Sequence, residues 1–206
     1  MITLHHLNKS RSKRIIWLLE ELGLEYNIQP YQRDAVTFLA PPELKAVHPL
    51  GKSPVLEDNG LVIAESGAIT EYLIDKFSDG KLAPEKGTTA YVEYLQWMHF
   101  AESSGILPPL LKIFVLKDGC DTNFLGDYAD AELAKVMSYL NSSLEGKRYL
   151  IEERLTGADI MISFIVEALK NLGEIEKYPN IQGYAAQLAT HPAFVKADHI
   201  EADAEK

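Results

Sequence analysis

The sequence predicts an α/β N-terminal part followed by an all-α C-terminal part. Short strand-like segments occur within the first eighty residues, where they alternate with helical ones in the order βαβαββα. Turn-forming residues then gather between residues 78 and 88, and beyond them the apolar residues recur only at helical spacing. These two observations divide the chain into domains at 1–80 and 88–206.

Each N-terminal element has a local signal. The expected strands are residues 2–7 and 26–30 and the two arms of a β-hairpin over 54–64. The hairpin is indicated by Asn59-Gly60, a pair that tolerates the positive φ angles of a type I′ turn. The expected helices are residues 15–22, which Gly23 ends, 42–47, which must end before Pro49, and a helix from Ser66 to Phe77.

The C-terminal part contains five helical segments. We expect helices near residues 91–101, 131–144, 156–172, 179–188 and 192–197. Pro108-Pro109 should kink or interrupt the first of them. Thr156 and Asp159 form a variant capping box, flanked by Leu155 and Ile160 as a hydrophobic staple, which is a folding signal rather than a functional one.

Composition excludes several classes of protein. The 206 residues are 47% hydrophobic and carry a net charge of −10, which is typical of a globular protein and unfavourable for nucleic-acid binding. The apolar runs are too short to cross a bilayer, and no signal peptide is recognisable. Cys120 is the only cysteine, and the six histidines lack metal-ligand spacing. We therefore expect a cytoplasmic protein with no metal site and no membrane partner.

The segment Asn8–Arg14 is the first candidate for chemistry. It contains two serines and four cations, and it precedes a helix, whose N-terminus has unpaired N–H groups and positive potential. That environment favours an anion, in particular a thiolate. The alternative is ordinary helix capping by Ser10 or Ser12 in a solvated basic turn, and the local sequence alone favours it.

Two further segments have binding potential. Pro54 at the start of a strand cannot donate to the sheet, and a cis Ser53–Pro54 bond would turn the Ser53 backbone outward toward an extended ligand. Ser66 at a helix start could hold a carboxylate, while Glu65 could hold an ammonium group. The alternatives are an edge-strand proline and simple capping.

Taken together, these segments resemble the glutathione S-transferase family over essentially the whole chain. The four similar segments, in family order, are residues 8–26, 48–56, 65–69 and 155–160. The resemblance implies an α/β thioredoxin-like N-terminal domain, an all-α helical-bundle C-terminal domain that lines the electrophile site, and a homodimer. Bacterial and fungal members of the family are the most similar.

The resemblance also implies a role for each matching position. Lys52 would bind the glycine carboxylate of glutathione, the backbone of Ser53 before the cis-proline Pro54 would pair with the cysteinyl part, and Glu65 and Ser66 would hold the γ-glutamyl end. Ser53 departs from the hydrophobic residue usual there, which is tolerable because the backbone does the binding.

The thiol-activating residue in this scheme is Ser10, with Ser12 and Asn8 as alternatives. A protein-thiol mechanism is disfavoured because position 10 is not cysteine, and the segment contains no tyrosine. The implied function is activation of glutathione, the cosubstrate, for attack on a small hydrophobic electrophile in detoxification. A glutathione-dependent peroxidase or disulfide reductase on the same scaffold, and a non-enzymatic binding protein, are the alternatives.

Overall fold

The computed structural model describes residues 1–204, which form two compact units. One unit contains Met1–Lys81 together with the segment that begins at Ala189, and the other is Leu82–Leu188. The expected division at 1–80 and 88–206 differs from these units at the C-terminal end. The last helix packs on the first helix of the chain, and this packing places it in the first unit.

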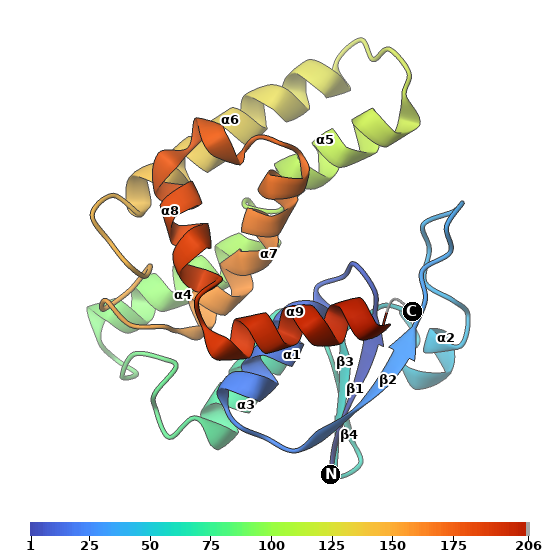
Figure 1. Ribbon diagram of the computed structural model, residues 1–206, viewed down its shortest axis with the longest axis vertical. Coiled ribbons are helices and arrows are strands. Elements are labelled where there is room, and N and C mark those ends of the chain that lie inside the picture. Colours follow the sequence, from blue (N-terminus) through green and yellow to red (C-terminus); the bar gives the residue numbers. More distant parts are fainter. Residues whose placement is uncertain (205–206) are drawn as a thin grey trace. The chain divides into compact units, whose positions relative to one another are not determined.

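The first unit is a four-stranded mixed sheet with helices on both faces (Figure 1). The strands β1 (Ile2–Leu7), β2 (Tyr26–Tyr31), β3 (Val55–Asp58) and β4 (Leu61–Ala64) lie in the order β2-β1-β3-β4. Only β1 and β2 are parallel. The helices α1 (Ser12–Glu21) and α3 (Ser66–Phe77) cover one face, and the short α2 (Leu44–Val47) lies on the other. This is the expected thioredoxin-like arrangement.

The core of this unit lies between the sheet and α1 and α3. The apolar residues that indicated the first helix are buried, and Ile15, Leu18 and Leu19 are fully so. Leu4 and Leu56, which are paired across β1 and β3, are also fully buried, as expected for a core between a sheet and an amphipathic helix. The hairpin turn is as predicted, because Asn59 and Gly60 have φ angles of 51° and 88°.

The final helix, α9 (Pro192–Ala204), is longer than the expected 192–197 and lies along α1. Figure 1 shows the two helices side by side in the first unit. Trp17 of α1 meets Phe194 edge to face, with ring centroids 5.0 Å apart. Polar residues after position 197 gave little helical periodicity, and this packing on α1 supplies the stabilisation that the local sequence lacks.

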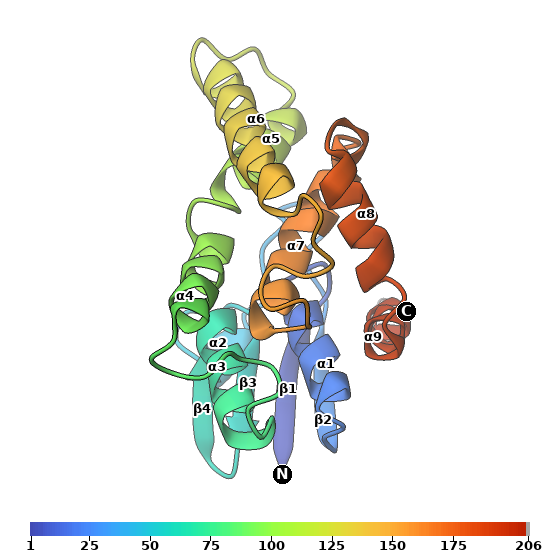
Figure 2. The ribbon, with the colours of Figure 1, turned by 90° about the vertical axis from the view of Figure 1, so that its left-hand side faces the viewer.

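The second unit is helical throughout its described residues. It contains α4 (Thr89–Glu102), α5 (Leu107–Asp118), α6 (Leu125–Ser143), α7 (Gly157–Asn171), the 3₁₀ turn η1 (Ile175–Lys177) and α8 (Pro179–Leu188). Figure 2 shows α5 and α6 as an antiparallel pair. The helix α7 is buried on nearly all sides, which explains its largely apolar sequence.

The helical run is interrupted before Pro108 and Pro109, which is one of the two expected outcomes, and the prolines do not kink a continuous helix. The helix α4 ends at Glu102, and the two prolines stand in the first turn of α5. Proline fits there because the first N–H groups of a helix have no intrahelical partner. Within residues 1–204, the helices all lack the combination of length and apolarity that a membrane span requires.

Candidate functional site

Three segments singled out in the sequence meet at one end of the sheet. In the register of the strands, His5 near the end of β1 lies opposite Val55 at the start of β3, and Val55 lies opposite Ala64 at the end of β4. The segments that adjoin these strand ends, 8–11, 51–54 and 65–66, therefore share the same edge. The topology thus brings the candidate thiol-activating and glutathione-binding residues into one region of the first unit.

The segment around Pro54 is fastened to β1 by a side chain. The Ser53–Pro54 peptide bond is cis. The Ser53 hydroxyl donates to the carbonyl of His5 at 2.8 Å and accepts from the N–H of Leu7 at 3.0 Å. The serine that stands where a hydrophobic residue is usual therefore ties the proline segment to the strand that leads into Asn8. This is a role that the sequence did not suggest.

Ser12 is fully buried and its hydroxyl is engaged. Its Oγ lies 2.5 Å from Nδ1 of His6, a residue that is itself inaccessible to solvent. Burial lowers the pKa of His6 to about 4, so the imidazole is neutral at pH 7. Nε2 of His6 lies 3.2 Å from the carboxylate of Glu201 in α9, although the two atoms are poorly aligned for a hydrogen bond.

These contacts favour one arrangement of the protons in the Ser12–His6 pair. A carboxylate beside Nε2 favours the tautomer with the proton on that nitrogen, which leaves Nδ1 as an acceptor. The Ser12 hydroxyl then donates to Nδ1 and has no hydrogen left for a ligand. Ser12 is therefore a buried structural residue.

Ser10 differs from Ser12 mainly in its hydrogen bonds. It is also buried, although 7% of the residue is exposed whereas Ser12 is inaccessible to solvent. Its Oγ accepts from the N–H of Ser12 at 3.2 Å, and among the described residues it donates to none. The oxygen is thus held in place while the hydroxyl hydrogen remains available to an acceptor outside the protein.

Asn8, the third candidate, is partly engaged. Its carbonyl oxygen accepts from the backbone N–H of Arg33 at 2.7 Å, and its own N–H donates to Tyr31 at 3.3 Å. Both contacts join the first residue after β1 to the end of β2. The amide nitrogen of its side chain is the group that remains for a ligand.

Two of the four cations of the segment are paired with α9 or buried. Lys13 pairs with Asp198 of α9 at 2.5 Å and lies 5.4 Å from the ring centroid of Phe194. Arg14 is only 2% exposed. Lys9 and Arg11, together with the start of α1, therefore remain as the sources of positive potential near Ser10.

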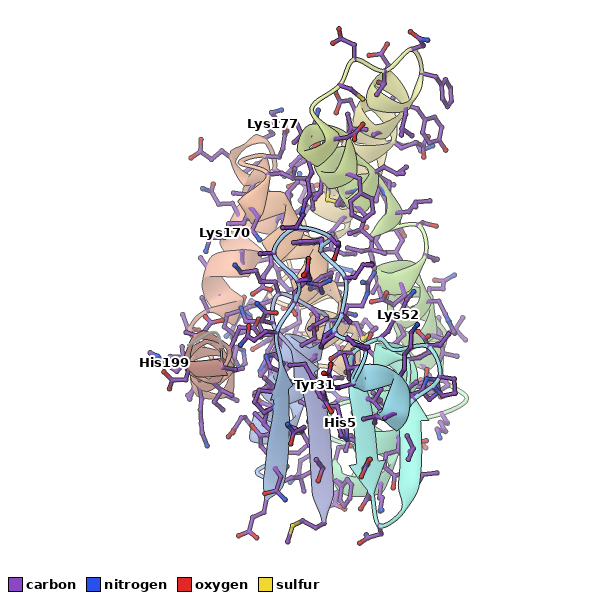
Figure 3. All side chains as sticks on the ribbon, turned by 90° about the vertical axis from the view of Figure 1, so that its right-hand side faces the viewer. His5, Tyr31, Lys52, Lys170, Lys177 and His199 are labelled. Atoms are coloured by element: carbon purple, nitrogen blue, oxygen red, sulfur yellow. The ribbon has the colours of Figure 1, made fainter. Side chains whose placement is uncertain are left out.

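The residues expected to hold the two ends of glutathione differ in their exposure to solvent. Lys52 and Glu65 are exposed, and Figure 3 shows Lys52 extending outward from its loop. Glu65 has a φ angle of 70° and occupies the capping position of α3, so Ser66 is the first helical residue and not the cap. The buried Ser66 hydroxyl makes no hydrogen bond with the described residues and can receive a ligand.

Glu201 is the residue of this region that the sequence did not reveal. Its Oε1 accepts from the backbone N–H of Lys9 at 2.7 Å. It lies almost at the other end of the chain, in a helix whose predicted bounds stopped short of it, so no local signal could identify it. Groups of three or more side chains suited to a metal ion do not occur within residues 1–204.

The chain is similar to known proteins along its entire length. Residues 1–75 match the family model "Glutathione S-transferase, N-terminal domain" and residues 123–192 match "Glutathione S-transferase, C-terminal domain". Glutathione S-transferase 3 of Schizosaccharomyces pombe is 31% identical, over 98% of this chain and 88% of its own length.

Two solved structures show the same fold. A glutathione S-transferase from Actinobacillus pleuropneumoniae is 40% identical with a TM-score of 0.89, covering 100% of this chain and 96% of that one. A glutathione transferase from Phanerochaete chrysosporium, in complex with oxidized glutathione, is 25% identical with a TM-score of 0.83, covering 98% and 97%. The chain therefore belongs to the glutathione S-transferase family of enzymes.

Proposed function

We propose that this chain binds glutathione at the sheet end formed by residues 8–11, 51–54 and 65–66, and activates its thiol as a thiolate. Lys52 binds the glycine carboxylate, the Ser53 backbone beside Pro54 pairs with the cysteinyl part, and Glu65 and Ser66 hold the γ-glutamyl end. The observation that carries the proposal is the convergence of these segments at one edge of the sheet. The fungal relative solved with oxidized glutathione supports the same ligand.

Ser10 is the proposed catalytic residue. Its hydroxyl donates a hydrogen bond to the glutathione sulfur, and the start of α1 adds positive potential. Lowering a thiol pKa from about 9 to about 7 requires about 3 kcal/mol. One charge-assisted hydrogen bond contributes about 1.5–3 kcal/mol, and a helix terminus contributes about 0.3–1 kcal/mol. These two interactions together are sufficient.

The activated sulfur then attacks an electrophilic carbon of a small hydrophobic substrate. A carbon–sulfur bond forms, and the leaving group departs with the electron pair of the bond that breaks. Assays with an aryl halide and with a hydroperoxide distinguish this conjugation from peroxidase chemistry on the same scaffold.

Binding measurements on two exposed residues test the glutathione site. Lys52→Ala and Glu65→Ala should each weaken glutathione binding by about 1–3 kcal/mol, the range for loss of a charged hydrogen-bond partner. Both side chains are exposed, so the fold should be unaffected. Isothermal titration calorimetry provides the affinities, and Glu71→Ala, an exposed carboxylate further along α3, is the matched control. Unchanged affinity in both variants would refute this placement of the ligand.

We further propose that the protein is a cytoplasmic homodimer that serves in detoxification. The aromatic residues Tyr94 and Trp97 of α4 are buried within their own unit and are not available for an interface. The edge strand β4 supports self-association instead, because its Leu61 and Val62 are 49% and 43% exposed. Sedimentation should show a mass near twice 23.0 kDa, and a monomer at micromolar concentration would contradict the dimer.

A further inference from the structure

The loop that carries Ser10 is fastened by the C-terminal helix. Glu201 in α9 accepts the Lys9 N–H with one carboxylate oxygen at 2.7 Å and places the other 3.2 Å from Nε2 of His6. Only 13% of the Glu201 side chain is exposed. One carboxylate thus contacts the residue before Ser10 and the histidine that bonds to Ser12.

The backbone at Lys9 is a conformation that needs such support. Its φ angle of 52° lies in the left-handed region, which is unfavourable for residues other than glycine. The peptide N–H of Lys9 is held by Glu201, and the next residue is Ser10. A change of φ at Lys9 would reorient the following peptide and with it the Ser10 hydroxyl.

The second contact of Glu201 reaches Ser10 by another route. The carboxylate favours the Nε2–H tautomer of His6, the Ser12 hydroxyl donates to Nδ1 at 2.5 Å, and the Ser12 N–H donates to Ser10 Oγ at 3.2 Å. The His6 contact holds Ser12 in place, and the backbone N–H of Ser12 in turn holds Ser10 Oγ. Both routes end at Ser10.

We propose that Glu201 is a positioning residue for the thiol-activating hydroxyl of Ser10. It acts through the Lys9 backbone and through the His6–Ser12 pair, and it does not touch glutathione. The proposal rests on the proposed role of Ser10. In this proposal α9, as well as the residues at the sheet end, influences the pKa of the glutathione thiol.

Other contacts attach α9 to α1 without involving this loop. Lys196 pairs with Glu20 at 2.6 Å, and Phe194 packs against Trp17. The helix should therefore remain docked when Glu201 is replaced. Lys196→Met removes an ion pair of the same helix away from Ser10 and is the matched control.

The experiment uses the full chain carrying Glu201→Ala, Glu201→Gln or Lys196→Met. Amide hydrogen exchange of Lys9 is measured without ligand, and the pKa of bound glutathione is measured from thiolate absorbance. Glu201→Ala should speed Lys9 exchange about tenfold or more and raise the thiol pKa by about one unit. Turnover at pH 7 should fall about tenfold with little change in glutathione KM. Glu201→Gln keeps an acceptor for Lys9 and should recover most of the exchange protection.

Two results would overturn the proposal. One is unchanged Lys9 exchange in Glu201→Ala, and the other is an equal effect of Lys196→Met on exchange and thiol pKa, which would mean that only helix docking matters. Failure of the proposed function is distinguishable, because wild-type protein would then leave the thiol pKa of glutathione unaltered. The exchange measurement would still decide whether Glu201 holds the loop.

Discussion

The N-termini of α1 and α7 differ in the groups that accept hydrogen bonds from their polar atoms. At α7, the carboxylate of Asp159 accepts from the N–H and hydroxyl of Thr156, from the N–H of Leu150 and from the Tyr184 hydroxyl, at 2.8–3.0 Å. These donors at the start of α7 are therefore satisfied by the protein itself. At α1, Arg11 supplies no capping hydrogen bond, and the N–H of Ser12 is accepted by the neutral hydroxyl of Ser10 at 3.2 Å, with no acidic residue in the first turn.

The difference separates a folding signal from a binding signal. Unpaired N–H groups at a helix start attract negative charge, whether from the protein or from a ligand. Where the acidic group is part of the chain, as in α7, the helix is stabilised and no site remains. Where it is absent, as in α1, the helix start remains suited to an anion such as a thiolate.

The largest effect should follow from removing the Asp159 carboxylate at the N-terminus of α7. Asp159→Ala leaves several buried donors without an acceptor, so the free energy of unfolding should fall by about 3–5 kcal/mol. Guanidinium titration measures the loss. Thr88→Ala, which removes the exposed cap of α4, is the control and should cost about 1 kcal/mol. A loss in Asp159→Ala no greater than that of the control would mean that the α7 box is not a major source of stability.

The next effect concerns the pH dependence of the first unit. The pKa of His6 is about 4 in the folded chain and 6.5 for an ordinary histidine, the value taken for the unfolded chain. Between these pH values the unfolded chain therefore binds one proton more than the folded chain. The contribution of His6 to the free energy of unfolding is therefore complete above pH 6.5. As the pH falls toward 4, this contribution decreases by about 3 kcal/mol. Urea titrations across this window should show the loss. His6→Asn should abolish that slope, and a slope that persists in the variant would assign it to another group.

The smallest of the three effects concerns Ser10 at the N-terminus of α1. Ser10→Ala should raise the pKa of the bound glutathione thiol by about one to two units, equal to about 1.4–2.7 kcal/mol. Turnover at pH 7 should fall accordingly with little change in KM. Ser12→Ala is the comparison. It should lower stability by about 1–3 kcal/mol through loss of its bond to His6, and it should raise the thiol pKa by less than Ser10→Ala does, because the Ser12 N–H that holds Ser10 Oγ remains. Identical thiolate titrations in Ser10→Ala and wild type would exclude Ser10 as the activator.

The sequence predicted the elements well where local patterns determine them. Apolar spacing placed α1 and α3, Asn59-Gly60 placed the hairpin, and the Thr156–Asp159 pair placed the start of α7. The site segments were identified because glycine, proline and serine signal local backbone geometry.

Contacts between distant parts of the chain could not be predicted in this way. The second half of α9 is polar and depends on α1 for its stability, so neither its length nor the position of Glu201 follows from local propensity. The pairing of Lys13 with Asp198 and the burial of Ser12 against His6 likewise require the folded chain. The choice between Ser10 and Ser12 depended on these contacts.

The contact between Lys9 and Glu201 has a consequence for biosynthesis. The two residues are 192 positions apart in the sequence, and translation at about 5–20 residues per second separates their synthesis by about 10–40 s. The sheet and its first helices leave the ribosome long before the helix that fastens the Ser10 loop. In a nascent chain the sheet residues are therefore present for most of the synthesis before Glu201 is available to bind the Lys9 N–H.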